Sequence, residues 1–174
     1  MNLPNKISFA RILFVPAFII TVVYNVKHIP LGIFSLCMIS DALDGLVARL
    51  SKSKTRLGTF LDPAGDKLLL ISAFMIYAIK GVIPWWLTIV ILMRDILIVH
   101  GWLFLYLVFN ITKVSPSALG KSTTFMQMLT VLCILVKGYI PIEQYLIYLY
   151  YLTGLVTILS GFDYLRTSIK GVQE

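Results

Sequence analysis

The chain has 174 residues, of which 59% are hydrophobic and only 13% are charged, and its mean hydropathy is +0.90. A typical soluble domain is about 25% charged and about 45–50% apolar, so this composition excludes an ordinary soluble protein and predicts an integral membrane protein. The net charge of +7 points to cytoplasmic loops and anionic lipid head groups. Nucleic acid is not expected as a partner, because no basic run is interleaved with aromatic residues.

Six apolar stretches follow one another along the chain, and each approaches or exceeds the ~20 residues that a spanning helix needs. Segments rich in Gly, Pro, Asn or Lys separate them, as is typical of turns. We therefore expect an all-α integral membrane protein with six transmembrane helices, in which residues 1–174 form a single transmembrane domain. The expected spans are residues 7–26, 30–50, 64–81, 84–110, 119–138 and 142–167.

The basic residues are distributed unevenly between the ends of these stretches. If six helices alternate across the membrane, 11 Lys or Arg fall on one side and 3 on the other, with Arg94 inside a span. Because cytoplasmic loops are enriched in Lys and Arg, we expect both termini in the cytoplasm. Cleavage of residues 1–26 as a signal peptide is not favoured, since Asn5, Ser8 and Arg11 share one helical face and removal would leave five spans.

Four of the eight acidic residues lie within 26 residues of one another, around the second connection. Asp41 and Asp44 are three apart near the end of the second stretch, and Asp62 and Asp66 are four apart at the start of the third. Both spacings place a pair on one helical face. Asp62-Pro63 also has the pattern of a helix start, with Asp62 as the N-cap and Pro63 at the first helical position.

The connection between these two stretches is short, so we expect antiparallel neighbouring helices whose four carboxylates converge on one pocket that faces the cytoplasm. Four close carboxylates cannot all remain ionised without positive charge between them. Oxygen ligands favour Mg²⁺ or Mn²⁺ over Zn²⁺, and two ions would suit phosphoryl chemistry. The alternative to a metal site is a purely structural role. Asp62 would then be only an N-cap, and Asp41 and Asp44 would form salt bridges with Arg49 or Arg94. This alternative does not explain why both pairs have a same-face spacing.

The acids belong to a longer pattern, D-x2-D-G-x2-A-R-x8-G-x3-D-x3-D, which runs from Asp41 to Asp66. Its fixed positions are Asp41, Asp44, Gly45, Ala48, Arg49, Gly58, Asp62 and Asp66. This pattern resembles the signature of the CDP-alcohol phosphatidyltransferase family, without departure at any of the eight positions. The six-helix bundle of that family and its cytoplasmic site agree with the expected spans, so the resemblance extends over the whole chain.

The resemblance implies an enzyme that moves a phosphatidyl group from CDP-diacylglycerol to an alcohol acceptor and releases CMP, with Mg²⁺ or Mn²⁺ as cofactor. It implies that Asp41, Asp44, Asp62 and Asp66 hold two metal ions, and that Asp66 is also the catalytic base for the acceptor hydroxyl. Residues implied in CDP-lipid binding are Gly45, Ala48, Arg49, Gly58, Asn5 and Ser8. A homodimer surrounded by membrane lipids, in the bacterial inner membrane and with the site facing the cytoplasm, is implied as well.

Outside the signature the chain resembles the branch of the family that uses glycerol 3-phosphate, the phosphatidylglycerophosphate synthases. The matching segments are Pro4-Asn5 with Ser8 and Arg11, Asp62-Pro63 to Asp66-Lys67 with Gly65 in place of Ala, and Gly120-Lys121 with Thr124 and Gln127. The phosphate of this acceptor needs cations. Lys121, Arg94 and Arg11 are therefore the candidate acceptor-binding residues.

Arg94 lies near the middle of the fourth stretch, where an ionisable residue is a candidate functional residue. The alternative role is a structural counter-ion for the carboxylates. Because adjacent residues do not face each other on a helix, we do not expect Arg94 and Asp95 to neutralise each other directly. Lys121, Thr124 and Gln127 form a polar stripe at helical spacing, and the alternative for this stripe is a hydrated helix end.

Two departures weaken the assignment of the acceptor. The chain has Arg94-Asp95 where that branch usually has Arg-Glu, and Thr123 where it usually has a second Lys. Both features resemble cardiolipin synthases of the CDP-alcohol type, whose acceptor, phosphatidylglycerol, demands less positive charge. A divalent-cation transporter is the alternative of another class, but such proteins more often place their acids at mid-membrane in broken or repeated helices.

Overall fold

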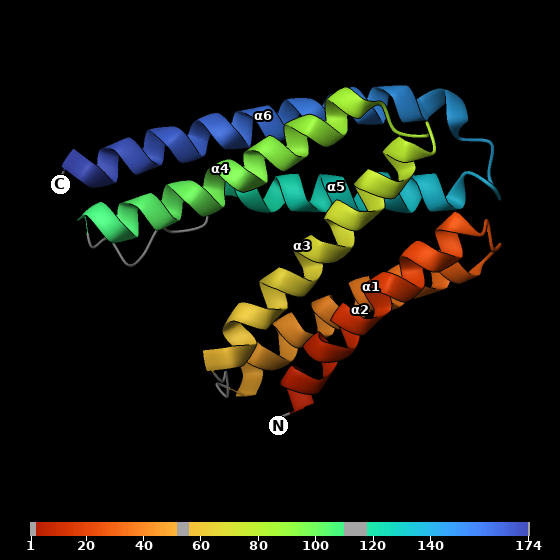
Figure 1. Cartoon of the computed structure of the whole chain (residues 1–174), viewed down its shortest axis with the longest axis horizontal. Coiled ribbons are helices and arrows are strands. Elements are labelled where there is room, and N and C mark those ends of the chain that lie inside the picture. The colour runs from red at the N-terminus through yellow and green to blue at the C-terminus, as the bar shows by residue number, and fades with distance from the viewer. Residues whose placement is uncertain (1–2, 52–55, 110–117, 174) are drawn as a thin grey trace. The chain divides into compact units, whose positions relative to one another are not determined.

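The structure, a computed structural model of the chain, describes residues 3–51, 56–109 and 118–173, and gives side chains for residues 13–40, 65, 67–105, 107–108 and 118–168. Its described part consists of helices joined by turns and contains no strand (Figure 1). The helices are α1 (Leu3–Val23), α2 (Ile29–Ser51), α3 (Arg56–Ile79), α4 (Trp85–Phe109), α5 (Ala118–Val136) and α6 (Glu143–Gln173). The all-α prediction is therefore confirmed.

The first compact unit, Met1–Lys80, consists of α1, α2 and α3, and α1 packs against both of the others. Its described core is apolar, with Phe18 and Phe34 in tilted contact at a ring-centroid distance of 6.1 Å. At the end of α3, the ammonium group of Lys80 donates hydrogen bonds to the Val22 carbonyl and to Asn25 Oδ1. These bonds bring the end of α3 to the end of α1, so these two helices run parallel.

The second compact unit, Gly81–Glu174, consists of α4, α5 and α6, and α6 packs against both of the others. Small residues allow the close approach of α4 and α6. A Cβ at Gly154 would lie 2.6 Å from the Trp86 ring, and one at Gly101 would lie 2.8 Å from the Tyr164 ring. The hydroxyl of Tyr150 donates a hydrogen bond to the Val82 carbonyl at 3.1 Å, which ties α6 to the segment before α4.

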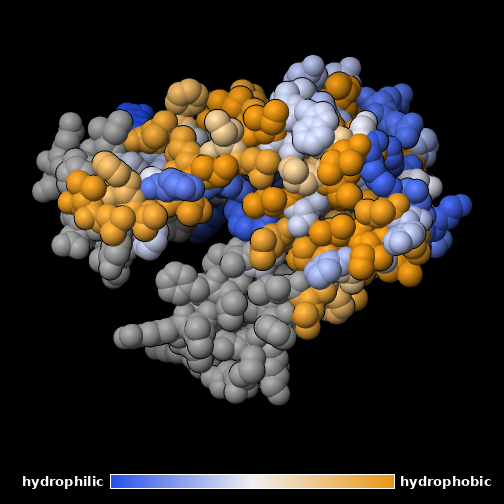
Figure 2. Space-filling model, viewed as in Figure 1, coloured by the Kyte–Doolittle hydropathy of each residue, from blue (hydrophilic) through white to orange (hydrophobic). Residues whose placement is uncertain are grey.

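Three helices are long and apolar enough to cross a membrane within the described residues: Trp85–Leu105, Ala118–Val136 and Glu143–Ser168. Shorter apolar helical segments cover Leu13–Val23, Ile29–Ser40 and Lys67–Ile79. Apolar side chains occupy much of the face that Figure 2 displays. The exposed large apolar side chains include Leu13, Leu36, Met93, Leu107, Leu155 and Phe162. A water-facing protein would not carry so many, and the chain is an integral membrane protein.

The helix boundaries depart from prediction most at α3. This helix begins at Arg56, not at residue 64. The predicted role of Asp62 as an N-cap is therefore wrong, because Asp62 lies more than one turn inside the helix. Pro63 lacks the amide proton for one intrahelical bond, and the helix runs through it nonetheless. At the other end of the chain, α6 continues to Gln173, beyond the expected residue 167.

Candidate active site

The eight signature residues lie on two consecutive helices. Asp41, Asp44, Gly45, Ala48 and Arg49 are on α2, and Gly58, Asp62 and Asp66 are on α3. An α-helix places residues three or four apart on the same face, so each pair of acids shares a face of its helix. Their side chains are outside the described part of the structure, and the convergence of the four carboxylates stays a prediction.

The first unit gathers the segments that carry these residues at one end. The short turn of residues 24–28 joins α1 to α2, which packs beside it, so α2 ends where α1 starts. Because α3 runs parallel to α1, its first turns lie at that end as well. Asn5, Ser8 and Arg11 are on the first turns of α1. The start of α1, the end of α2 and the start of α3 therefore lie at the same end of this unit. The side chains of Asn5, Ser8 and Arg11 are also outside the described residues.

Arg94 lies buried on α4, with an exposed fraction of 9%. Its Nη1 donates to the Asp95 carboxylate at 2.8 Å, and its Nη2 donates to Ser160 Oγ on α6 at 3.0 Å. The expectation that Arg94 and Asp95 do not neutralise each other is therefore wrong. Their Cα–Cβ bonds diverge on the helix, but the Arg side chain is long and flexible enough to turn back toward its neighbour. Burial makes the pairing worthwhile, because an isolated charge there would be costly.

The polar stripe on α5 descends from an exposed residue to a buried one. Lys121 is exposed, Thr124 is half-buried and donates to the Gly120 carbonyl, and Gln127 is fully buried. The amide oxygen and nitrogen of Gln127 have no hydrogen-bond partner among the described residues. Lys121 is thus exposed near the start of α5, while Gln127 lies inside the second unit. In the described part of the chain, no hydrogen bond joins Lys121 to Arg94.

Sequence reasoning missed the polar face of α6. Ser160 binds Arg94, Thr153 shares a hydrogen bond of 2.8 Å with Thr130 of α5, and the carbonyl of Val156 accepts from Thr123 at 3.3 Å. A signal was present, since small and polar residues recur every three or four positions along α6. Such spacing is typical of a face that packs closely against other helices in a membrane.

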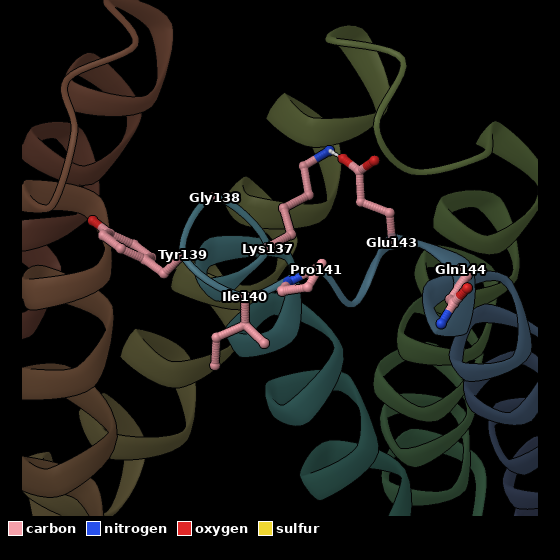
Figure 3. A pocket seen from close by; sticks show the side chains of 7 residues that line it. All are labelled: Lys137, Gly138, Tyr139, Ile140, Pro141, Glu143 and Gln144. Atoms are coloured by element: carbon pink, nitrogen blue, oxygen red, sulfur yellow. Dashed lines mark ion pairs between the residues drawn. The ribbon is translucent and has the colours of Figure 1, made fainter.

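An open pocket of about 650 Å³ lies where α5 ends and α6 begins, and Figure 3 shows its lining side chains. Lys137 and Glu143 point toward each other there, with Nζ and Oε1 at 3.7 Å. None of the predicted site residues lines this pocket. Lys137 directly follows α5 and lies 16 residues after Lys121. At the helical rise this is about 24 Å along the axis, so the pocket belongs to the opposite end of α5 from Lys121.

The donor set of the signature suits a hard divalent cation. Four carboxylates, two on α2 and two on α3, offer only oxygen ligands, which Mg²⁺ and Mn²⁺ prefer. Elsewhere in the described residues, no group of three or more His, Cys, Asp or Glu is placed to hold a metal. The metal prediction therefore depends on these four aspartates alone.

Comparison with known proteins defines the class. The sequence profile of the CDP-alcohol phosphatidyltransferase family matches residues 1–158, and the chain belongs to this family of enzymes. A Mycobacterium tuberculosis protein named "Probable phosphatidylglycerophosphate synthase" is 29% identical over 98% of this chain and 83% of its own length. A Sodalis glossinidius protein named CDP-diacylglycerol–glycerol-3-phosphate 3-phosphatidyltransferase is 29% identical over 95% of this chain and 93% of its own.

A third relative carries a different name. It is a Mycobacterium bovis protein provisionally named cardiolipin synthase, and it is 33% identical over 72% of this chain and 60% of its own length. The family resemblance drawn from the signature is confirmed by the profile and by these relatives. The membrane character, the helical fold and the transferase class all agree with it.

Proposed function

We propose that the chain transfers a phosphatidyl group from CDP-diacylglycerol to glycerol 3-phosphate and releases CMP. The observation that carries this proposal is the complete eight-position signature on α2 and α3, in a chain whose family profile covers residues 1–158. The likeness to the Sodalis protein, which runs over nearly the full length of both chains, supports glycerol 3-phosphate as the acceptor.

In this proposal Asp41, Asp44, Asp62 and Asp66 hold two divalent ions, Mg²⁺ or Mn²⁺. Bound ions of this kind neutralise charge on the pyrophosphate of the donor and on the leaving CMP. Family membership supports the need for a divalent metal. The helical spacing of the aspartates supports the ligand set, since each helix offers two carboxylates on one face.

Asp66 accepts the proton of the acceptor hydroxyl. The acceptor oxygen then forms a bond to the phosphorus of the phosphatidyl group, and the bond from that phosphorus to the oxygen of CMP breaks. Gly45, Ala48, Arg49 and Gly58, with Asn5 and Ser8 on α1, bind the CDP-lipid. Lys121, Arg94 and Arg11 bind the acceptor phosphate, with the exposed ammonium group of Lys121 as its first contact.

We infer that residues 1–174 act as one catalytic domain of six transmembrane helices, with both termini and the active site on the cytoplasmic side of the bacterial inner membrane. The distribution of Lys and Arg supports this orientation. Exposed aromatic residues at the opposite end of the second unit support a membrane interface there, since Trp and Tyr favour that depth. These residues are Trp85, Trp86, Tyr139, Tyr145, Tyr148 and Tyr151. A homodimer in the lipid bilayer completes the proposal by family resemblance.

An acceptor panel tests the function. Purified protein in detergent with Mg²⁺ and CDP-diacylglycerol labelled in its acyl chains is given one acceptor at a time: glycerol 3-phosphate, phosphatidylglycerol, serine or inositol phosphate. We expect labelled phosphatidylglycerophosphate from the first alone. A labelled product from another acceptor, with none from glycerol 3-phosphate, would show that glycerol 3-phosphate is not the acceptor. The assignment of the chain as a phosphatidyltransferase would still hold.

Cardiolipin synthesis is the second candidate function. Arg94-Asp95 and Thr123 favour it, as does the 33% identity to the Mycobacterium bovis protein. The pairing of Arg94 with Asp95 bears on this choice, because it reduces the positive charge that Arg94 offers to a phosphate monoester. Labelled cardiolipin in the phosphatidylglycerol sample of the panel would favour this candidate.

A further inference from the structure

Buried polar side chains are concentrated in the second unit. Where burial is described, all nine buried polar or charged side chains come from α4, α5 and α6. They are Thr88, Arg94, Asp95, Thr123, Gln127, Thr130, Thr153, Thr157 and Ser160. A buried polar group within membrane helices costs free energy unless it is hydrogen-bonded. Each of these side chains is therefore expected to have a hydrogen-bond partner.

The hydroxyl groups of this interior find partners within the protein. Thr123, Thr130 and Thr157 each donate to the carbonyl four residues earlier in their own helices. Ser160 accepts from Arg94, and Thr153 pairs with Thr130. A short hydroxyl side chain can always return to its own helix in this way. The hydrogen bonds of these hydroxyl groups are therefore satisfied within the protein and require no ligand.

Gln127 is different. Its residue is 0% exposed, yet both polar atoms of its amide have no partner among the described residues. Arg94 Nε, a donor from α4, is also buried without a partner in that part of the chain. A buried amide that stays unsatisfied loses the hydrogen bonds it would make to water and gains nothing in return. The Gln127 amide needs a group that donates and accepts at once, and an acyl chain offers neither.

The polar stripe of α5 runs from the exposed start of the helix to Gln127. Lys121 is exposed, Thr124 lies almost one turn further in and is half-buried, and Gln127 lies almost one turn beyond Thr124. The three residues follow each other by three positions, so they form a continuous polar line on the helix. The line leads inward from the exposed start of α5.

We propose that Gln127 is a binding residue for a hydroxyl group at the inner end of this stripe. The ligand is either an internal water molecule or a hydroxyl group of the acceptor. Both supply a donor and an acceptor to the same amide. The second source rests on the proposed function, whereas the first does not.

Nuclear magnetic resonance on the full chain in nanodiscs, with glutamine labelled by ¹⁵N in the side chain, tests the site directly. The chain has three glutamines, Gln127, Gln144 and Gln173. Gln144 is exposed and serves as the control for bulk solvent. The Gln127→Met variant, which keeps the length but removes the amide, assigns the signal. If that variant does not fold, the Gln144→Asn and Gln173→Asn variants assign it by elimination.

An internal water predicts magnetisation transfer from water to the Gln127 amide, together with resistance to broadening by a soluble gadolinium chelate that broadens Gln144. An acceptor hydroxyl predicts a shift of the Gln127 signal when glycerol 3-phosphate is added, whereas a permanent internal water predicts no such shift. The absence of both water transfer and a shift would overturn the proposal, whatever the enzyme does.

Steady-state kinetics separate the two sources further. If the acceptor hydroxyl binds Gln127, Gln127→Met raises the KM for glycerol 3-phosphate about tenfold, the value of one lost hydrogen bond, and leaves the KM for CDP-diacylglycerol unchanged. If water is the ligand, Gln127→Met changes neither KM, and only the magnetisation transfer from water to the Gln127 amide is lost. The Thr130→Val variant, which removes a hydroxyl group with an internal partner, controls for general disturbance of α5.

Discussion

Asp66 is the last of the four acids in the signature, and its carboxylate has the proposed role of taking the proton from the acceptor hydroxyl. Substitution by Asn preserves the size of the side chain but removes the basic oxygen. We expect Asp66→Asn to lower kcat by about 10²–10⁴-fold, the typical contribution of a general base, and more if a metal ion is lost as well. CDP-diacylglycerol should still bind.

The matched control is Asp163→Asn on α6, which makes the same chemical change away from the signature. Release of labelled CMP measures turnover, and equilibrium binding of labelled CDP-diacylglycerol measures retention of the donor. Normal turnover by Asp66→Asn would remove this residue from the base role.

The Arg94–Asp95 pair makes a second prediction at the scale of single residues. Asp95→Asn leaves the Arg94 charge buried without its counter-ion, so we expect the free energy of unfolding to fall by about 3–5 kcal/mol. The double variant Arg94→Gln with Asp95→Asn removes both charges and should recover most of that loss. Thermal unfolding in detergent measures both, and a double variant no more stable than Asp95→Asn would show that the charge pairing is not the cause.

The pair also shows where residue-scale reasoning from sequence fails. Helical spacing predicts shared faces for the acid pairs of α2 and α3 from the backbone alone, and each pair does lie within one helix. It gave the wrong answer for Arg94 and Asp95, because the conformation of a long side chain decides the contact. The partner of Arg94 on α6, Ser160, is 66 residues away in the chain, and no local pattern predicts such a contact.

At the scale of helices, the contact of α4 with α6 depends on a missing side chain at Gly154. A Cβ there would lie 2.6 Å from Trp86 Cζ3, and the Trp86 ring is stacked on Tyr151 with centroids 5.4 Å apart. The Trp86 ring would have to shift from this stacked position, so Gly154→Ala should lower the free energy of unfolding by about 1–3 kcal/mol.

Gly32→Ala on α2 is the matched control, since nothing lies within 4 Å of its would-be Cβ. It should be neutral or slightly stabilising, because Ala favours a helix more than Gly does. Denaturation curves of the two variants in the same detergent make the comparison. Equal effects would mean that the Trp86 contact does not restrict this position.

Element boundaries were predictable where apolar stretches end in turns, as for α4 and α5, whose ends differ from the expected spans by one or two residues. The start of α3 was not predictable in this way. Asp62-Pro63 has the composition of a helix start, but the helix already runs through it from Arg56. A local start signal of this kind is overridden when the preceding polar residues can also be helical.

At the scale of the whole molecule, the proposed orientation predicts which connections face the cytoplasm. Cysteine introduced at Gly138, in the exposed turn between α5 and α6, should react with a membrane-impermeant maleimide on intact bacterial cells. Cysteine introduced at Lys121 should react only after the cells are opened. A background variant with Cys37 and Cys133 replaced by Ser provides the blank. The reverse pattern of labelling would invert the topology and move the active site to the other side.

The central claim concerns phosphatidyl transfer at the four aspartates, and the stoichiometry of its two products tests it most directly. Purified protein is supplied with CDP-diacylglycerol, glycerol 3-phosphate and Mg²⁺, and CMP and phosphatidylglycerophosphate are quantified together. We predict equal amounts of both, abolished by a chelator and restored by added Mg²⁺ or Mn²⁺, and absent in Asp41→Asn. No release of CMP with any acceptor, or release that persists in the chelator, would contradict the account.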